Sequence, residues 1–99
     1  MAATGTGTFN NFIDGESVAA AEGRTTEVLN PADGKPFAQA PDSTEEDINR
    51  AVKAARAAFD GWANTTPGER SNALLKLADA LEAQGDDLAE LEARNAGKP

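Results

Sequence analysis

One stripe of apolar residues in the second half of the chain limits the folds that this sequence can adopt. Its members lie four, three, four and three residues apart: Ile48, Val52, Ala55, Phe59 and Trp62. This spacing places them on one face of an α-helix, with the intervening charged and amide side chains turned away from it. Such a helix is stable only when another surface covers its apolar face. The fold therefore has to supply that surface.

Capping signals mark where the helices begin. Ser43, with Glu46 three residues later, predicts the start of the first helix, because the two side chains together satisfy backbone donors that a first helical turn leaves open. Thr66 as N-cap, Pro67 at the first helical position and Glu69 predict the second helix in the same way. The inner face of that second helix is marked by Leu74, Leu77 and Leu81.

Glycines divide the remaining helical sequence. Gly85 is expected to end or bend the second helix, and Asp86 can then cap a third. In this third helix Leu88 and Leu91 are expected to face inward, and Gly97 is expected to stop it.

The first 41 residues have the pattern of short strands and turns. Residues 1–8 are small and polar and predict a flexible tail. Asp14-Gly15 predicts a tight hairpin turn, because both residue types tolerate positive φ. A turn-rich NPADGKP segment separates a β-favouring TTEVL run from a possible fourth strand, FAQAP. Two small hairpins and one meandering sheet both fit. The predicted fold class is α+β, with short β-hairpins followed by three amphipathic helices.

The composition does not supply a full hydrophobic core. Ala accounts for 21 of the 99 residues, whereas Leu, Val, Ile and Phe together account for 16. This is about 16% of the chain, below the roughly 20% at which strongly charged sequences begin to look disordered. Small chains also bury a smaller share of their surface than large ones. We therefore expect the large apolar side chains to need more covering surface than these residues provide.

Charge and composition exclude several classes of function. The net charge of −8 argues against binding to nucleic acid or to an anionic membrane, since both require a basic face. The sequence predicts neither a secretory signal nor a transmembrane helix, and the expected location is cytoplasmic. Cys and His are absent, so the chain has no disulfide, no thiolate nucleophile and no imidazole base.

The candidate acidic and glycine motifs do not form an active site. Glu90 and Glu92 lie two residues apart on a helix, so they point to different sides and cannot work as a catalytic pair. Asp86-Asp87 is explained by a helix N-terminus, where negative charge is favoured. The GTGT stretch lacks the Lys and the strand–helix context of a phosphate loop. Phe59 and Trp62 can be read either as core or as a partner-binding patch, and the partner can be the rest of the same polypeptide.

The order of these segments resembles the amino-terminal part of an aldehyde dehydrogenase. The stretches that carry the resemblance cover residues 9–99 and read, in chain order, NNFIDGE, GRTTEVLNPADGKPFAQAP, STEEDINRAVKAARAAFDGW and TTPGERSNALLKLADALEAQGDDLAELEARNAGKP. Within the family, GRTTEVLNPADG and TTPGER are most similar to aminoaldehyde (aminobutyraldehyde) and betaine-aldehyde dehydrogenases.

The resemblance implies that residues 9–99 are the incomplete start of a Rossmann-like α/β cofactor-binding domain in a longer chain. In this family a Cys attacks the aldehyde, hydride passes to NAD⁺ or NADP⁺, and a Glu activates the water that releases the acid. None of these residues maps onto this chain, so the parent protein is expected to be an oxidoreductase while these 99 residues alone bind no NAD(P)⁺ and catalyse nothing. The implied partners are the remainder of the polypeptide and, for the full-length protein, further copies in a homo-oligomer.

The resemblance also implies a site for Na⁺ or K⁺ formed by main-chain carbonyls. The matching positions are Val28, Leu29 and Asn95. Hard cations suit carbonyl oxygens, so the side chains at these positions matter little. The alternative is that the two segments are ordinary turns.

Two hypotheses from different classes follow. The first is an amino-terminal segment of an NAD(P)⁺-dependent aldehyde dehydrogenase, catalytically incomplete by itself. The second is a free-standing acidic α+β interaction module that binds a partner through the stripe from Ile48 to Trp62.

Overall fold

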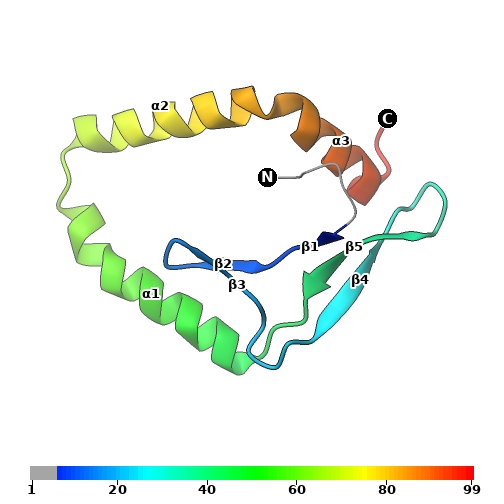
Figure 1. The fold of residues 1–99 in the computed structure, drawn as a ribbon. Coiled ribbons are helices and arrows are strands. Elements are labelled where there is room, and N and C mark those ends of the chain that lie inside the picture. Colours follow the sequence, from blue (N-terminus) through cyan, green and yellow to red (C-terminus); the bar gives the residue numbers. More distant parts are fainter. Residues whose placement is uncertain (1–6) are drawn as a thin grey trace.

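The computed structural model describes residues 7–99 as short strands followed by three helices, which confirms the expected α+β class. Figure 1 shows the helices as an arch that leaves the strands at one end and returns to them at the other. The elements are β1 Gly7–Thr8, β2 Asn11–Ile13, β3 Glu16–Val18, β4 Thr25–Leu29, β5 Pro36–Pro41, α1 Glu45–Ala63, α2 Pro67–Ala83 and α3 Gly85–Ala96.

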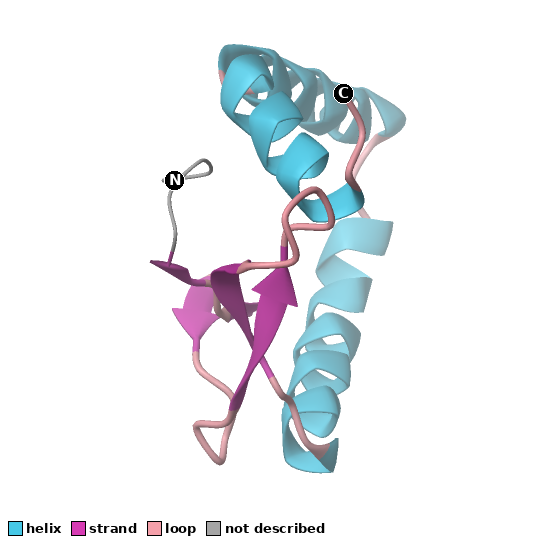
Figure 2. Ribbon diagram, turned by 90° about the vertical axis from the view of Figure 1, so that its right-hand side faces the viewer, coloured by secondary structure: helices cyan, strands magenta, loops and turns pink. Residues whose placement is uncertain are grey.

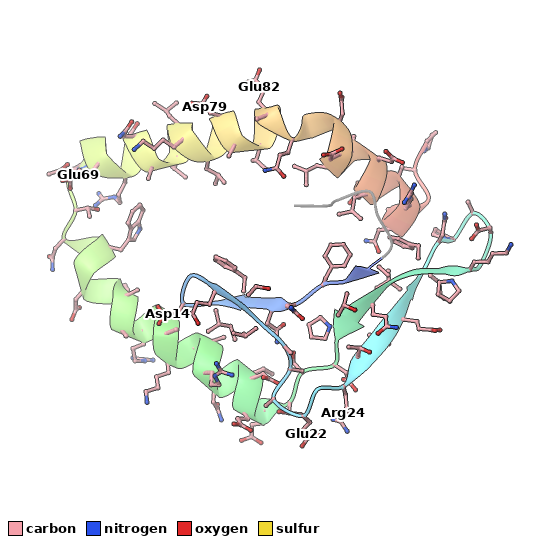
Figure 3. The ribbon with its side chains drawn as sticks, in the orientation of Figure 1. Asp14, Glu22, Arg24, Glu69, Asp79 and Glu82 are labelled. Atoms are coloured by element: carbon pink, nitrogen blue, oxygen red, sulfur yellow. The ribbon has the colours of Figure 1, made fainter. Side chains whose placement is uncertain are left out.

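Strands β2 and β3 form the hairpin predicted from Asp14-Gly15. Ile13 pairs with Glu16, so the loop has two residues, and both have positive φ, 53° at Asp14 and 78° at Gly15. Two residues with positive φ give the turn whose twist matches that of antiparallel strands. The hairpin packs beside α1, and Figure 3 shows Asp14 at its tip next to that helix.

Strands β4 and β5 form the second predicted hairpin, in a separate sheet of order β1-β5-β4. The sequence pattern also predicted a flexible tail over residues 1–8, which is wrong for Gly7 and Thr8. These two residues form β1 and pair in parallel with β5, and the amide of Phe9 continues the ladder to the carbonyl of Gln39 at 2.8 Å. β1 thus occupies the edge of β5 that β4 leaves unpaired, and an unpaired strand edge accepts an extended segment. Residues 1–6 lie outside the described part of the chain.

Helix α1 begins one residue later than predicted. Its N-cap is Thr44, not Ser43, and the carboxylate that closes the cap belongs to Asp47 rather than Glu46. The reason is tertiary: the hydroxyl of Ser43 accepts a hydrogen bond from Nδ2 of Asn11 on β2 at 2.8 Å, which ties Ser43 to the hairpin.

Helix α2 begins as predicted. The backbone amide of Glu69 donates to the Thr66 hydroxyl at 3.2 Å, the Thr66 amide donates to the Glu69 carboxylate at 2.7 Å, and Pro67 is the first helical residue. This reciprocal pair satisfies two backbone donors that would otherwise have no partner in the helix.

Helix α3 follows α2 after a single residue, and this part of the prediction needs correction. The prediction made Asp86 the N-cap, but Gln84 occupies that position and Gly85 is already helical. Asp86 and Asp87 lie in the first turn instead, where negative charge interacts favourably with the helix dipole. The predicted stop is confirmed, because Gly97 has φ 73° at the C-terminal end.

The described chain is open rather than compact. The radius of gyration is 16.5 Å, whereas a compact domain of about 100 residues has roughly 13 Å. The accessible surface is 7381 Å², against about 5,300 Å² for a compact monomer of this mass. Figure 2 shows the arrangement from the side, with the strands on one side of the helices.

Little of the described chain is buried. Within residues 7–99 the buried residues are Ala20, Phe37, Ala38 and Asp47, of which only Phe37 and Ala38 lie on β5, so the core is small. This confirms the expected shortage of core. Along residues 7–99, no helix has both the length and the apolar character needed to cross a membrane.

Candidate functional site

An apolar cavity of about 510 Å³ lies between the sheet and α3. Its sheet side is formed by Phe9, Val28, Phe37, Ala38 and Ala40, and its helix side by Leu88, Leu91, Glu92 and Asn95. Leu88 and Leu91 thus face the strands, as the sequence pattern predicted. The cavity wall is almost entirely hydrocarbon, so it suits apolar side chains rather than a charged substrate.

The structure brings together two of the three positions expected to hold a monovalent cation. Val28 and Asn95 line the same cavity, although they are far apart in the sequence. Leu29 is not part of that lining and is 51% exposed. The strand pairing is irregular between Val28 and Leu29, where the register against β5 shifts. A bulge of this kind disrupts the regular pairing of backbone groups in the ladder.

The carboxyl end of α3 touches the turn between β4 and β5. A Cβ placed on Gly97 would lie 2.9 Å from Cγ of Pro31, so the Gly97 backbone packs closely against the proline ring there. Asn95 lies in the last turn of α3, where carbonyl groups lack helical partners. The residue four positions later is Pro99, which has no N–H to donate.

The shared cavity, the bulge at Val28 and Leu29 and the end of α3 are compatible with a cation site formed by carbonyl oxygens. A helix carboxyl end carries partial negative charge, and a free carbonyl oxygen there suits Na⁺ or K⁺. Within residues 7–99 no group of three or more acidic side chains is placed to hold a metal ion. The set of Val28, Leu29 and Asn95 carbonyls therefore stays a prediction.

A second candidate surface is the apolar face of the helical arch. The large members of the α1 stripe are more than half exposed, from 52% at Trp62 to 66% at Phe59. On α2, Leu74, Leu77 and Leu81 are exposed to a similar degree. Neither face is part of the core of the described chain. Phe59 and Trp62 could be read as core or as a partner-binding patch. Their exposure favours the patch, whose partner can be the rest of the same polypeptide.

The acidic residues of α3 do not converge on a catalytic site. Glu90 accepts a hydrogen bond from the Arg94 guanidinium at 2.9 Å, and Glu92 lies 4.0 Å from the Lys98 ammonium. The two carboxylates therefore have different partners, in agreement with the prediction that they point to different sides. Each pair lies at the surface, where ion pairs contribute little to stability.

One buried carboxylate holds the helix to the strands. Asp47 is 2% exposed and accepts hydrogen bonds from the Thr44 amide at 2.8 Å and the Ala21 amide at 2.9 Å. These bonds favour the charged form, so the pKa of Asp47 is lowered from its ordinary value, chiefly by the Thr44 amide and against the opposing effect of burial. The charge of Arg50 adds a smaller contribution in the same direction.

Asp47 also bears on whether this segment can hold a dinucleotide. Phosphate groups bind at helix N-termini, where free amides point at the anion. The described connection from strand to helix runs from β5 to α1, and there Asp47 already accepts the Thr44 amide. Glu45 and Glu46 add negative charge to the same turn. The N-terminus of α1 therefore does not fit the phosphates of NAD(P)⁺.

The sequence pattern did not identify Asp47 or the aromatic wall of the cavity. Both Ser43 with Glu46 and Thr44 with Asp47 match the capping pattern, and the sequence does not distinguish them. Phe9 and Phe37 lie in short runs without a clear period, so nothing local marked them as neighbours of α3.

Comparisons with known protein families and sequences lead to the same family. A family model described as "Aldehyde dehydrogenase family" matches residues 18–99. An aldehyde dehydrogenase of Aspergillus niger is 48% identical over 88 residues, which is 88% of this chain and 18% of that protein.

Solved structures agree with the sequence match. An NAD-dependent aldehyde dehydrogenase of Sinorhizobium meliloti superimposes with a TM-score of 0.91 at 34% identity, over 98% of this chain and 20% of that one. An aldehyde dehydrogenase of Bacillus cereus has a TM-score of 0.88 at 46% identity, over 93% and 19%. The chain thus spans about a fifth of the length of the proteins it resembles.

Proposed function

Because the chain belongs to the aldehyde dehydrogenase family, we propose that it works as the amino-terminal segment of an enzyme that oxidises an aldehyde to its carboxylic acid with NAD⁺ or NADP⁺. The observation that carries this proposal is the superposition of 98% of the chain, at a TM-score of 0.91, on a fifth of an NAD-dependent aldehyde dehydrogenase. The nucleophile and the cofactor contacts belong to other parts of such an enzyme, since this chain has no Cys.

The role of this segment is then structural. It adds two small sheets and a helical arch whose apolar faces pack against the larger body of the enzyme. NAD(P)⁺ accepts hydride when it is bound in the whole enzyme, and the described residues of this segment take no direct part in that step.

For the substrate we propose an aldehyde in general and an aminoaldehyde in particular. The narrower proposal is supported by two stretches, residues 23–34 and 65–70, that resemble aminoaldehyde and betaine-aldehyde dehydrogenases. The three relatives described above carry the general aldehyde dehydrogenase name. We also propose that the full-length protein forms a homo-oligomer, as the resemblance implies.

The alternative, a free-standing interaction module, fits the exposed stripe on α1 equally well. The shape of the chain favours the first hypothesis, a segment of a larger enzyme, over the free-standing module. A module that folds by itself is expected to be compact, but the radius of gyration is 16.5 Å where roughly 13 Å is normal for this length.

A chimera tests the proposal. In the aldehyde dehydrogenase of Bacillus cereus, the part that matches this chain is replaced by this chain, and NADH formation is followed by absorbance with an aliphatic aldehyde and with an aminoaldehyde. We expect a folded chimera that produces NADH. A folded chimera that produces none, next to an active parent enzyme, contradicts the proposal. The aminoaldehyde preference is tested separately, on the full-length enzyme that contains this segment: kcat/KM values that are equal for an aminoaldehyde and an aliphatic aldehyde contradict it.

A further inference from the structure

We propose that this chain is a separable segment: it binds in trans, without a covalent link, to an aldehyde dehydrogenase chain that lacks the matching part. The binding surface is the apolar inner face of the arch, defined as Ile48, Val52, Phe59 and Trp62 on α1 with Leu74, Leu77 and Leu81 on α2. This inference rests on the proposed function and adds that association does not require a peptide link between the two parts.

The size of the exposed surface indicates a large partner. The accessible area of 7381 Å² exceeds by roughly 2,000 Å² the area of a compact monomer of this mass. Specific interfaces of standard size bury about 800 Å² on each partner, whereas obligate interfaces bury about 1,000–2,500 Å² or more on each. A surface of this size matches the packing of one part of a fold against the rest of it.

The placement of apolar and charged groups indicates which side is covered. Val52, Ala55 and Phe59 line one hollow on α1. On α2, Asp79 and Glu82 project from the outside of the arch, away from the strands (Figure 3). The outer side of α2 therefore carries acidic residues that suit water, and these residues provide matched controls.

Contacts among the segment's own residues hold parts of it in place. Asp47 joins α1 to the loop before β4, Thr66 and Glu69 cap α2, and Gly97 packs against Pro31. The arrangement superimposes on the matching fifth of an aldehyde dehydrogenase with a TM-score of 0.91. Each contact that is already formed in the free segment reduces the conformational entropy lost on binding, which favours association without a peptide link.

A second copy of this chain is a poorer occupant of the same face. Each copy carries a net charge of −8, so two copies repel each other at neutral pH. The comparisons also supply a body of the required size, since this chain is only 20% of the matched structure from Sinorhizobium meliloti.

The test mixes this chain with the aldehyde dehydrogenase of Bacillus cereus made without the segment that matches it. Binding is measured by isothermal calorimetry and analytical ultracentrifugation, and NADH formation is measured on the mixture. The variants are Val52→Asp with Leu77→Asp, separately Phe59→Ser, and the outer-face control Asp79→Asn. Circular dichroism first shows which variants keep the helix content of the original chain.

We expect a one-to-one complex, binding weakened at least tenfold by each inner-face variant that keeps its helices, and no change with Asp79→Asn. If the shortened dehydrogenase is insoluble alone, it is co-expressed with each version of this chain, and we expect recovery of soluble complex with the original and the control only. Absence of a complex, or of recovery, overturns the inference, as does equal binding by inner-face variants. Self-association of this chain in place of binding also overturns it. Activity of the covalent chimera separates these failures from a failure of the proposed function.

Discussion

The carboxylate of Asp47 and the backbone amide of Ala21, 26 residues apart in the sequence, are joined by a hydrogen bond of 2.9 Å. The same carboxylate accepts the amide of Thr44 at the N-cap of α1. One side chain therefore satisfies the first turn of the helix and fixes it to the loop between the two hairpins. This relationship holds α1 against the strands, while the apolar stripe of α1 stays exposed.

The first prediction concerns this carboxylate. The lowered pKa of Asp47 means that its contribution to stability is present above the ordinary value of 3.8 and is lost as the pH falls through the lowered value in the folded chain. Asp47→Asn should therefore lower the urea midpoint at pH 7, and the difference from the original chain should shrink below about pH 4. Urea unfolding followed by circular dichroism at several pH values measures both midpoints. Asp79→Asn, on the exposed outer side of α2, should leave the midpoint unchanged at every pH, and a constant deficit in Asp47→Asn down to pH 2 would contradict the assignment.

The second prediction concerns the close approach at the end of α3. Gly97 has φ 73°, and an added Cβ would lie 2.9 Å from Pro31. Gly97→Ala should destabilise the chain by about 1 kcal/mol or more, because Ala disfavours positive φ and the contact is too short. Gly61→Ala is the control, since Gly61 is helical and nothing lies near its Cβ position. That change should stabilise by about 0.5–1 kcal/mol. Similar effects of both changes on urea unfolding would show that the Gly97 contact is absent.

The third prediction concerns the cap of α2. Thr66→Ala removes the hydroxyl that accepts the Glu69 amide, and it should cost about 1 kcal/mol of stability. Ser71→Ala, at an exposed position inside the same helix, should be neutral or slightly stabilising. Urea unfolding followed at 222 nm compares the two. A loss in Ser71→Ala equal to that in Thr66→Ala would mean that the cap contributes nothing specific.

The fourth prediction concerns the exposed apolar faces. The chain should show helical circular dichroism, a broad thermal transition and strong binding of a hydrophobic dye, because ten large apolar side chains among the described residues are more than half exposed. Replacing Val52 and Leu77 by Asp should reduce dye fluorescence several-fold without loss of helix. A sharp transition at high temperature with little dye binding, from a monomer, would favour the free-standing module.

The fifth prediction concerns catalysis. This chain, mixed with NAD⁺ and an aminoaldehyde, should form no NADH above a protein-free control, because it has no Cys to act as the thiolate nucleophile. The aldehyde dehydrogenase of Bacillus cereus serves as the positive control. Saturable NADH formation by the purified 99-residue chain would disprove the assignment of catalysis to other parts of the enzyme.

The sequence by itself determined the local elements. Asp14-Gly15 specified its turn because both residues tolerate positive φ, and Thr66, Pro67 and Glu69 specified the start of α2 because a capping box needs only residues three apart. The apolar spacing on α1 predicted a helix with one face in need of cover, and that face is exposed in the structure.

Only the tertiary structure decided how these elements meet. The choice of Thr44 over Ser43 as N-cap depended on Asn11, which engages Ser43 from another hairpin. The pairing of Gly7 and Thr8 with β5 depended on an open strand edge, and the meeting of Val28 with Asn95 depended on where α3 returns to the sheet. The physical reason is the separation of the interacting residues along the sequence. Backbone preferences and hydrogen bonds between residues three apart act locally. The contacts made by Asn11, β1 and Asn95 join residues that only the folded chain brings together.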